Sequence, residues 1–433
     1  MRTYLESKEL NNLKAVIGTV TGKDIVVSFK FGTRVVEDRM SNICMVLAGT
    51  EQLVMQFTSM KPDDFDGTPV IVNFKQKELL SVLNSLSAMN EKIYFESTAA
   101  GCDIGIEDSA NIKVPTVGND SLPPVISPVK EKTQIQFTAS SNQLSEALIA
   151  GMSMTGSMDG MDNVALIFDK MDATEEKVNS TIKVMSTDSF RIIRGQAPIT
   201  VANSDISTEN RKEVLKNGQI TVPVGQATVA NLAKLLTMCK DCKILITDKH
   251  VTVAIGASIM YTFVRASKVL SINDKVDGWV AADKCIRIVV DANELKQKVD
   301  LLNTASELSE VKKPIRFFIE EGKKVRIGID ASDTAMVEFK PVDSVVKQNL
   351  EINLNSKLLT NALNNLKKGN ISISFMAHKK IRNMPVMFTN GDLEKTVDNA
   401  TVIFLMPVAD SEASQPKDDT AAGSETEGVM EEE

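Results

Sequence analysis

The chain has few of the residues on which enzyme chemistry most often depends. Among its 433 residues there are only two histidines, His250 and His378, and each falls in an ordinary strand or loop pattern. No nucleophile elbow, phosphate-binding loop or paired-glycine fingerprint occurs in the chain. We therefore expect a protein that binds other molecules and has no catalytic activity.

Cysteines are also few, and their spacing suits neither a disulfide framework nor a metal site. The five are scattered thinly, which is typical of reduced thiols. Cys239 and Cys242 form a C-x-x-C pair, but no second pair and no histidine lies at the spacing of zinc ligands. We expect core and loop thiols, no bound metal and no cofactor. The five positions are Cys44, Cys102, Cys239, Cys242 and Cys285.

Long apolar runs are absent. No stretch approaches the roughly 18 consecutive apolar residues that a membrane-spanning helix requires. The first residues, from Met1 to Glu6, lack the apolar core of a signal peptide. With 43% hydrophobic residues the composition is that of a globular protein, so we expect a cytoplasmic location and no membrane partner.

The negative charge of the chain is concentrated at its end. Residues 409–433 hold nine of the 57 acidic residues and one of the 49 basic residues, which leaves 48 of each in the body. The net charge of −8 therefore belongs to this tail. We expect the tail to be disordered and to repel DNA, whereas the body is free to approach it.

A strand followed by an amphipathic helix recurs six times along the body. In each helix the apolar residues are spaced to line one face. Four of the five gaps between successive leading residues lie between 64 and 69 residues, so the repeat is regular. The leading apolar residues of the six helices are Leu10, Leu79, Leu144, Val229, Leu295 and Leu359.

The residues after each helix predict antiparallel hairpins, as in "KILITDKHVTVAI" and "IRFFIEEGKKVRIGI". One unit of about 65 residues is too small to be stable alone, so the units should pair into α+β domains. Boundaries then fall near "SLPPVISPVKEK" and "SINDKVDGWVAADK". We expect three domains, 1–128, 129–278 and 279–408, followed by the acidic tail 409–433.

Two short motifs add to this repeat. The stretch "STDSFRI" lies in the second expected domain, and the body ends in "FLMPV". In this order, within a sixfold repeat, they resemble the bacterial beta sliding clamps, the processivity factors of replicative DNA polymerases. The resemblance covers residues 1 to about 408. It implies three tandem clamp domains, each of two helix-plus-antiparallel-strand units, in a crescent that dimerises into a ring around double-stranded DNA.

The resemblance also implies a hydrophobic pocket for partner peptides. In sliding clamps the replicative polymerase, the clamp loader and other proteins with a clamp-binding motif insert a short apolar peptide there. Methionine suits such a site because its flexible, polarizable side chain adapts to different ligands. By position, one wall would be Thr187, Arg191 and Ile192, the other Leu405, Met406, Pro407 and Val408, and the rim Pro385.

DNA contact and dimerisation are implied by position as well. Lys23 and Lys75 match places where clamps contact DNA, without regard to its sequence. A head-to-tail homodimer would join the first domain to the third through Ile112 and Val114 on one side and Leu301 and Leu302 on the other. Further basic residues on or beside the repeated helices are Lys8, Lys14, Lys77, Lys234, Lys296, Lys298, Lys367 and Lys368.

The chain departs from the family pattern at three places. The usual T-D-G-H-R has Ser189 and Phe190 at its centre, which enlarges one side of the pocket and removes a glycine. The aromatic-Pro-Asp-Tyr motif is replaced by "VRASKVLSI", and the acidic tail extends beyond the usual end. These differences predict a different peptide preference.

Other classes of protein remain open at this point. A trimeric clamp like proliferating cell nuclear antigen, a polymerase accessory factor that does not close into a ring, and a structural repeat protein would each contain repeated units. Six units in one chain favour a dimeric ring, whereas four would favour a trimer. A catalytic protein is the alternative from a further class.

Overall fold

The structure is a computed structural model. It describes residues 2–18, 26–36, 39–48, 51–57, 70–98, 101–118, 133–168, 177–206, 219–237, 240–255, 259–270, 272–308, 314–329, 335–366, 369–378, 381–390 and 401–408. These residues fall into two compact units, Met1–Asp277 with Gly391–Ile403, and Gly278–Asn390 with Phe404–Glu433. The division into three domains stays a prediction.

The six predicted helices are all present, and their leading apolar residues are buried. Each begins within a few residues of the end of a strand, as the repeat predicts. The strand and helix pairs are β1 (Arg2–Leu5) and α1 (Ser7–Ile17), β5 (Val70–Lys75) and α2 (Gln76–Ser87), β9 (Thr133–Ser140) and α3 (Ser141–Gly151), β13 (Ile220–Gly225) and α5 (Gln226–Leu236), β17 (Lys284–Asp291) and α7 (Ala292–Leu308), and β22 (Leu350–Leu354) and α8 (Ser356–Asn365).

The first unit has two antiparallel sheets. The small sheet has the order β1-β6-β7-β8, with β6 (Ile93–Thr98), β7 (Gly101–Ile106) and β8 (Ala110–Val114). The pairings of the large sheet run β5-β2-β3-β4-β16-β15-β14-β9-β12-β11-β10-β13. Its other strands are β2 (Val26–Val36), β3 (Arg39–Ala48), β4 (Glu51–Phe57), β10 (Asn163–Phe168), β11 (Lys177–Thr187), β12 (Arg191–Ile206), β14 (Asp241–Thr247), β15 (His250–Ile255) and β16 (Ile259–Val264).

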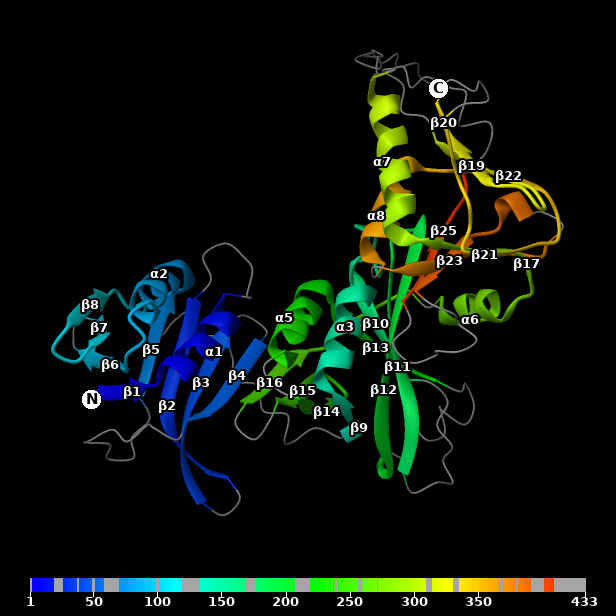
Figure 1. The fold of residues 1–433 in the computed structure, drawn as a ribbon. Helices are drawn as coiled ribbons and strands as arrows, with labels where there is room; N and C mark the ends of the chain where they lie inside the picture. The colour runs from blue at the N-terminus through cyan, green and yellow to red at the C-terminus, as the bar shows by residue number, and fades with distance from the viewer. Residues whose placement is uncertain are drawn as a thin grey trace, which may run out of the picture. The chain divides into compact units, whose positions relative to one another are not determined.

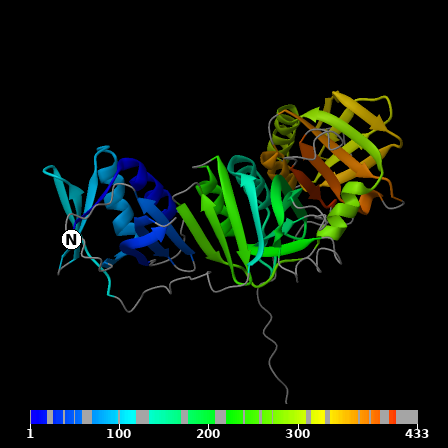
Figure 2. The same cartoon turned by 90° about the horizontal axis from the view of Figure 1, so that it is seen from below.

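The helices of the first unit pack in pairs. Helices α1 and α2 lie side by side, as do α3 and α5 (Figure 1, Figure 2). Helix α3 packs against β11 and β12. Gly195 on β12 permits this close approach, because a Cβ there would lie 2.4 Å from the Ala147 carbonyl oxygen of α3. Helix α3 therefore packs directly against the backbone of β12 at Gly195.

The second unit repeats the arrangement. Strand β17 pairs with β21 (Asp343–Val346) and β23 (Asn370–Met376), and β23 pairs with β24 (Val386–Asn390). A four-stranded sheet has the order β20-β19-β18-β22, with β18 (Ile315–Ile319), β19 (Val325–Gly328) and β20 (Met336–Phe339). Helices α7 and α8 lie side by side (Figure 1). A 3-10 turn, Ile381–Asn383, precedes β24, and the last strand is β25 (Val402–Leu405).

Both hairpins predicted from the sequence are confirmed. Ile244 lies opposite Val253 in the pair β14–β15, and Phe317 lies opposite Ile327 in the pair β18–β19. In each case the apolar residues of the two strands share the buried face, as the alternating pattern requires.

The stretch expected to hold the second domain boundary contains a helix, α6 (Asn273–Ala281). Val276 is buried, and Asp277 forms ion pairs with Lys183 at 3.0 Å and with Arg194 at 2.6 Å. These contacts attach the start of α6 to β11 and β12. The first expected boundary, near residues 121–132, lies outside the described residues.

The described cysteines agree with the prediction of free thiols in the core. Cys102, Cys242 and Cys285 are free and buried, as predicted. The side chain of Cys44 and the whole of Cys239 lie outside the described residues. Within the described part of the chain, no helix has both the length and the apolar character that crossing a membrane would require.

Candidate functional site

A tight turn joins β11 to β12 and carries the T-D-x-x-R motif. The Asp188 carboxylate accepts hydrogen bonds from the backbone N–H groups of Phe190, at 3.1 Å, and of Arg191, at 2.8 Å. The Thr187 hydroxyl donates to the Arg191 carbonyl oxygen at 2.8 Å. The side chains of the motif therefore close the turn on itself, which is the local role that Asp and Thr commonly have.

The charges of the motif neutralise each other. The Arg191 guanidinium donates through Nε to Asp188 Oδ2 at 2.8 Å, and a second guanidinium nitrogen makes an ion pair with the same oxygen. Both side chains are largely buried. A planar guanidinium held in this way is fixed in direction. Arg191 and the half-buried Ile192 thus form a rigid surface with little net charge.

Ser189 and Phe190 occupy the tip of the turn. Ser189 has a backbone φ of 77°, in the left-handed region that favours glycine. Its hydroxyl lies 3.2 Å from the sulfur of Met161. Phe190 is 63% exposed, which is unusual for so large an apolar side chain. The turn keeps the glycine-like backbone although the glycine is absent.

The C-terminal segment forms the second candidate wall. Strand β25 is buried, so Leu405 is covered, whereas Met406, Pro407 and Val408 are half-buried. The Val408 N–H donates to the Asn353 carbonyl oxygen at 2.9 Å, which holds the end of the body on β22. The Phe404 ring lies 5.4 Å from the ring of Trp279.

Pro385, the expected rim residue, is buried directly before β24. Pro385 belongs to the same unit as Met406 and Pro407, whereas Thr187 and Arg191 belong to the other unit. The union of the two walls into one pocket stays a prediction.

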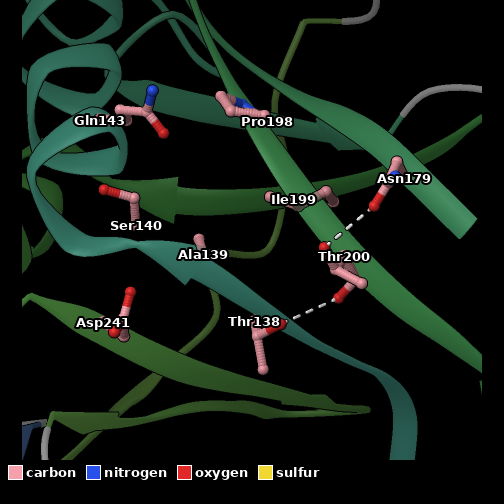
Figure 3. A pocket seen from close by; sticks show the side chains of 9 residues that line it. All are labelled: Thr138, Ala139, Ser140, Gln143, Asn179, Pro198, Ile199, Thr200 and Asp241. Atoms are coloured by element: carbon pink, nitrogen blue, oxygen red, sulfur yellow. Dashed lines mark hydrogen bonds between the residues drawn. The ribbon is translucent and has the colours of Figure 1, made fainter. Parts of the chain in front are cut away.

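A cavity of about 390 Å³ lies elsewhere in the first unit, beside β9, β11, β12 and β14 (Figure 3). Polar side chains such as Gln143 and Asp241 line it, and Thr200 donates to Asn179 at 3.2 Å. None of the predicted site residues takes part.

A metal site of the usual kind is missing from the described ranges. No group of three or more His, Cys, Asp and Glu side chains there is placed to hold a metal ion. His250 and His378, the two histidines, lie in separate units.

The basic residues are sparse on the helices. Lys75 is exposed and lies 3.9 Å from Glu78, whereas Lys23 lies outside the described residues. Lys14 donates to Ser87 at 2.5 Å and so bridges α1 and α2. The six repeated helices together contain seven basic and six acidic residues. Their combined charge is therefore close to zero.

The residues expected at a dimer interface differ in exposure. Leu301 on α7 is 59% exposed, whereas Leu302 is 2% exposed and belongs to the core. Ile112 is half-buried on β8, the last strand in the order of its sheet, and Val114 is buried. Leu301 and Ile112 are therefore the residues of this set whose side chains are exposed enough to contact a second chain.

No protein-family profile matches the chain, and no curated protein sequence matches it. Solved structures do. The DNA polymerase III beta subunit of Thermotoga maritima superposes with a TM-score of 0.69 at 12% identity, over 94% of this chain and 99% of that one. The sliding clamp of Pseudomonas aeruginosa, solved with a ligand, gives 0.69 at 15% identity, over 94% and 100%. A Bartonella birtlesii clamp bound to griselimycin gives 0.67 at 14% identity, over the same shares.

The chain has the fold of the bacterial sliding clamps. This confirms the fold class predicted from the repeat, which was a mixture of helices and antiparallel sheets. At identities of 12–15% in these three structures, the likeness shows the clamp fold alone.

Sequence reasoning missed several residues around the turn of this clamp fold. The run "GMSMTGSMDGMD" is not part of either predicted motif, yet Met158 and Met161 contact Ser189 from it. Four methionines in ten residues were the available signal, because methionine is common at adaptable contact surfaces. The hydrogen bond from Val408 to Asn353 uses the backbone carbonyl oxygen of Asn353, so no residue type in the sequence indicates it.

Proposed function

We propose that the protein is a DNA sliding clamp, a processivity factor that encircles duplex DNA without regard to sequence. It tethers the replicative polymerase, the clamp loader and other partners through a hydrophobic peptide pocket, and it performs no catalytic step. The observation that carries this proposal is the clamp fold over 94% of the chain. The T-D-x-x-R turn and the Met-Pro end, found from the sequence, occur within that fold.

The two walls support the peptide pocket. The Thr187 to Ile192 turn is rigid and internally neutralised, and Met406 and Pro407 are half-buried on an anchored segment. Rigid walls with little net charge bind short peptides well, because little conformational entropy is lost on binding. A peptide with large apolar side chains is the ligand that these walls suit.

The helices support encirclement more than tight binding. Because their charges almost cancel, few phosphates would be neutralised, and DNA affinity measured on an open duplex should be low and only weakly dependent on salt. A ring retains DNA by topology. Lys75 and Lys77 are exposed and supply some of the positive charge that remains.

A homodimer would complete the ring. The exposed Leu301 and the edge position of β8 support an interface that joins the first and third domains head to tail. A dimer of six-unit chains agrees with the repeat count.

The pocket is tested with the double variant Met406→Ala and Pro407→Ala. We expect at least a tenfold loss of affinity for a fluorescent peptide of the host polymerase, with an unchanged circular dichroism spectrum and oligomeric mass. The matched control is Lys357→Ala, on an exposed helical surface. Equal affinity of the double variant and the control would remove the pocket from the proposal.

Encirclement is tested separately on nicked circular DNA, after loading by the host clamp loader. The protein should stay on the circle through gel filtration and be released once a restriction enzyme linearises the DNA. Release from the intact circle at the same rate would contradict a closed ring and favour an accessory factor that does not close.

A further inference from the structure

Strand β21 has one uncovered edge in the second unit. Among the described strands it pairs with β17 alone, and it lies beside that strand (Figure 1). The edge of a strand that has no neighbour presents N–H and C=O groups with which another strand can pair. This edge therefore has room for one more strand.

The backbone groups of Ser344 and Val346 form the uncovered edge. The Lys347 N–H donates to the Cys285 carbonyl oxygen of β17 at 2.9 Å, so the backbone groups of Lys347 point toward β17. Alternate residues of an antiparallel strand direct these groups to the same side, so those of Val345 point there as well. The groups of the two residues on either side of Val345 then point away from β17.

The side chains of β21 are mostly exposed. Asp343, Ser344 and Val345 are exposed, and Val346 is half-buried. Val345 is 46% exposed, and Val342, directly before the strand, is 65% exposed. Because β-branched residues fit a paired strand well, this segment has both the residue types and the free edge that strand pairing requires.

The charges of β21 are placed symmetrically about Val345. Asp343 precedes that residue by two positions and Lys347 follows it by two, so the three side chains share one face. Asp343 lies 3.4 Å from Arg287 and is 61% exposed, and Lys347 is exposed with no ion pair among the described residues. Charges on an edge strand commonly oppose pairing, but two opposite charges at these positions attract each other when the strand pairs with itself.

We propose that β21 pairs antiparallel with β21 of a second copy of the chain, about a two-fold axis that passes between the two Val345 residues. Ser344 then lies opposite Val346 of the second copy, and these two residues exchange both of their outward backbone hydrogen bonds. The two Val345 side chains meet in the non-hydrogen-bonded pair at the centre, where side chains lie closest. Asp343 faces Lys347 of the second copy at each end.

This contact is separate from the contact of the proposed ring. The ring contact uses Leu301 on α7 and the edge of β8, and neither belongs to β21 or to its neighbour β17. A pairing of one short strand buries little surface, so it forms at high protein concentration and dissociates on dilution, whereas the ring contact persists. The partner that fits β21 is therefore another copy of this chain from outside the same ring. The inference uses only the geometry of β21 and does not depend on the proposed function.

The variant Val345→Cys tests the register by disulfide formation. Residues opposite each other in a non-hydrogen-bonded pair have Cα atoms about 4.5 Å apart, which a disulfide can span. The full chain is oxidised with diamide at high protein concentration and analysed on a non-reducing gel. The matched control is Val342→Cys, which is more exposed but would lie opposite Gln348 of the second copy, far from the axis. The unmodified chain controls for the native cysteines.

We expect Val345→Cys to form a covalent dimer about tenfold faster than Val342→Cys. The same rate is expected when Leu301→Lys is added to Val345→Cys, because the ring contact is not involved. Equal rates for the two cysteine variants overturn the pairing. Loss of the crosslink on addition of Leu301→Lys overturns its independence of the ring.

Charge variants of the Val345→Cys chain test the ends of the pair. Asp343→Lys and Lys347→Asp each place like charges opposite each other, so either variant alone should crosslink several times more slowly. In a mixture of the two variants, opposite charges face each other at both ends, and crosslinks between unlike chains should recover, as measured by mass spectrometry. Circular dichroism checks that both variants fold. A mixture that crosslinks no faster than the separate variants overturns the proposed arrangement.

Discussion

Ser189 shows how a single residue departs from the sliding-clamp pattern while the backbone does not. With a φ of 77° it keeps the left-handed conformation that glycine adopts freely and that other residues adopt at a cost. The hydroxyl contact to Met161 offsets part of this cost. A serine therefore stands here in a backbone conformation that suits glycine.

Ser189→Gly should raise the unfolding free energy by about 0.5 kcal/mol, because relief of the left-handed strain outweighs the added freedom of the unfolded chain. Ser189→Ala keeps the strain and loses the hydroxyl, so it should lower stability by a similar amount. Urea denaturation followed by circular dichroism measures both. Destabilisation by the glycine variant as well would show that the Met161 contact dominates.

Cys102 is buried, and burial, together with the nearby charges of Asp103 and Glu96, raises the pKa of its thiol to about 12. At pH 8 only about one thiol in ten thousand would be the reactive thiolate. We expect iodoacetamide to leave Cys102 unmodified in the native protein and to modify it fully in urea, as measured by peptide mass spectrometry. Rapid native labelling would mean that β7 opens readily.

Among the secondary-structure elements, α6 depends most on charge. Burial alone would raise the pKa of the Asp277 carboxyl, but the hydrogen bonds and charges of Lys183 and Arg194 are stronger together and lower it. Asn273 also donates to this carboxylate at 3.0 Å. The start of α6 is therefore attached to β11 and β12 by one acid and two buried bases.

Asp277→Asn should destabilise the first unit by about 3 kcal/mol, since it removes the carboxylate that pairs with two buried cations. The control Asp274→Asn, also on α6, should cost much less because Asp274 is exposed and accepts a hydrogen bond from the neutral side chain of Gln219. Because the pKa of Asp277 is lowered, its carboxylate contributes its full stabilisation above about pH 4. This contribution is lost as the pH falls through the pKa that Asp277 has in the folded protein. The stability gap between wild type and Asp277→Asn should therefore shrink below pH 4, which urea titrations at several pH values would measure.

Strands and helices with a strong period were predictable from the sequence. Apolar spacing predicts the helix faces that begin at Leu10 and Leu359 and the hairpin at Ile244. The prediction succeeds because this spacing depends only on which residues are buried. Helix α6 was not predictable in this way. Its short sequence has one buried anchor, Val276, and its attachment comes from Lys183 and Arg194, more than eighty residues earlier in the chain.

The candidate site was predictable only in part, for a related reason. The T-D-x-x-R and Met-Pro motifs located two walls, but a motif carries no information on which neighbouring loop packs against it. The approach of Gly156 to Asp188 and the exposure of Phe190 arise from tertiary packing. The same limit explains why Leu302 was expected at an interface although its side chain belongs to the core.

At the scale of the whole molecule, the proposed ring depends on self-association. Leu301→Lys places a charge in the proposed interface, and we expect a change from dimer to monomer in size-exclusion chromatography with light scattering. The control variant Val264→Lys, which changes another exposed apolar residue, should remain a dimer. A dimer that survives Leu301→Lys would place the interface elsewhere, and a trimer of the wild type would favour the other clamp architecture.

The ring contact between Trp279 and Phe404 has a practical consequence for such work. Because the chain has one tryptophan, emission excited selectively at tryptophan originates next to the last strand. Any ligand or mutation that shifts the C-terminal segment should change the wavelength or intensity of that emission. The protein therefore carries its own optical probe, and occupancy at its Met-Pro end can be followed in real time without a dye.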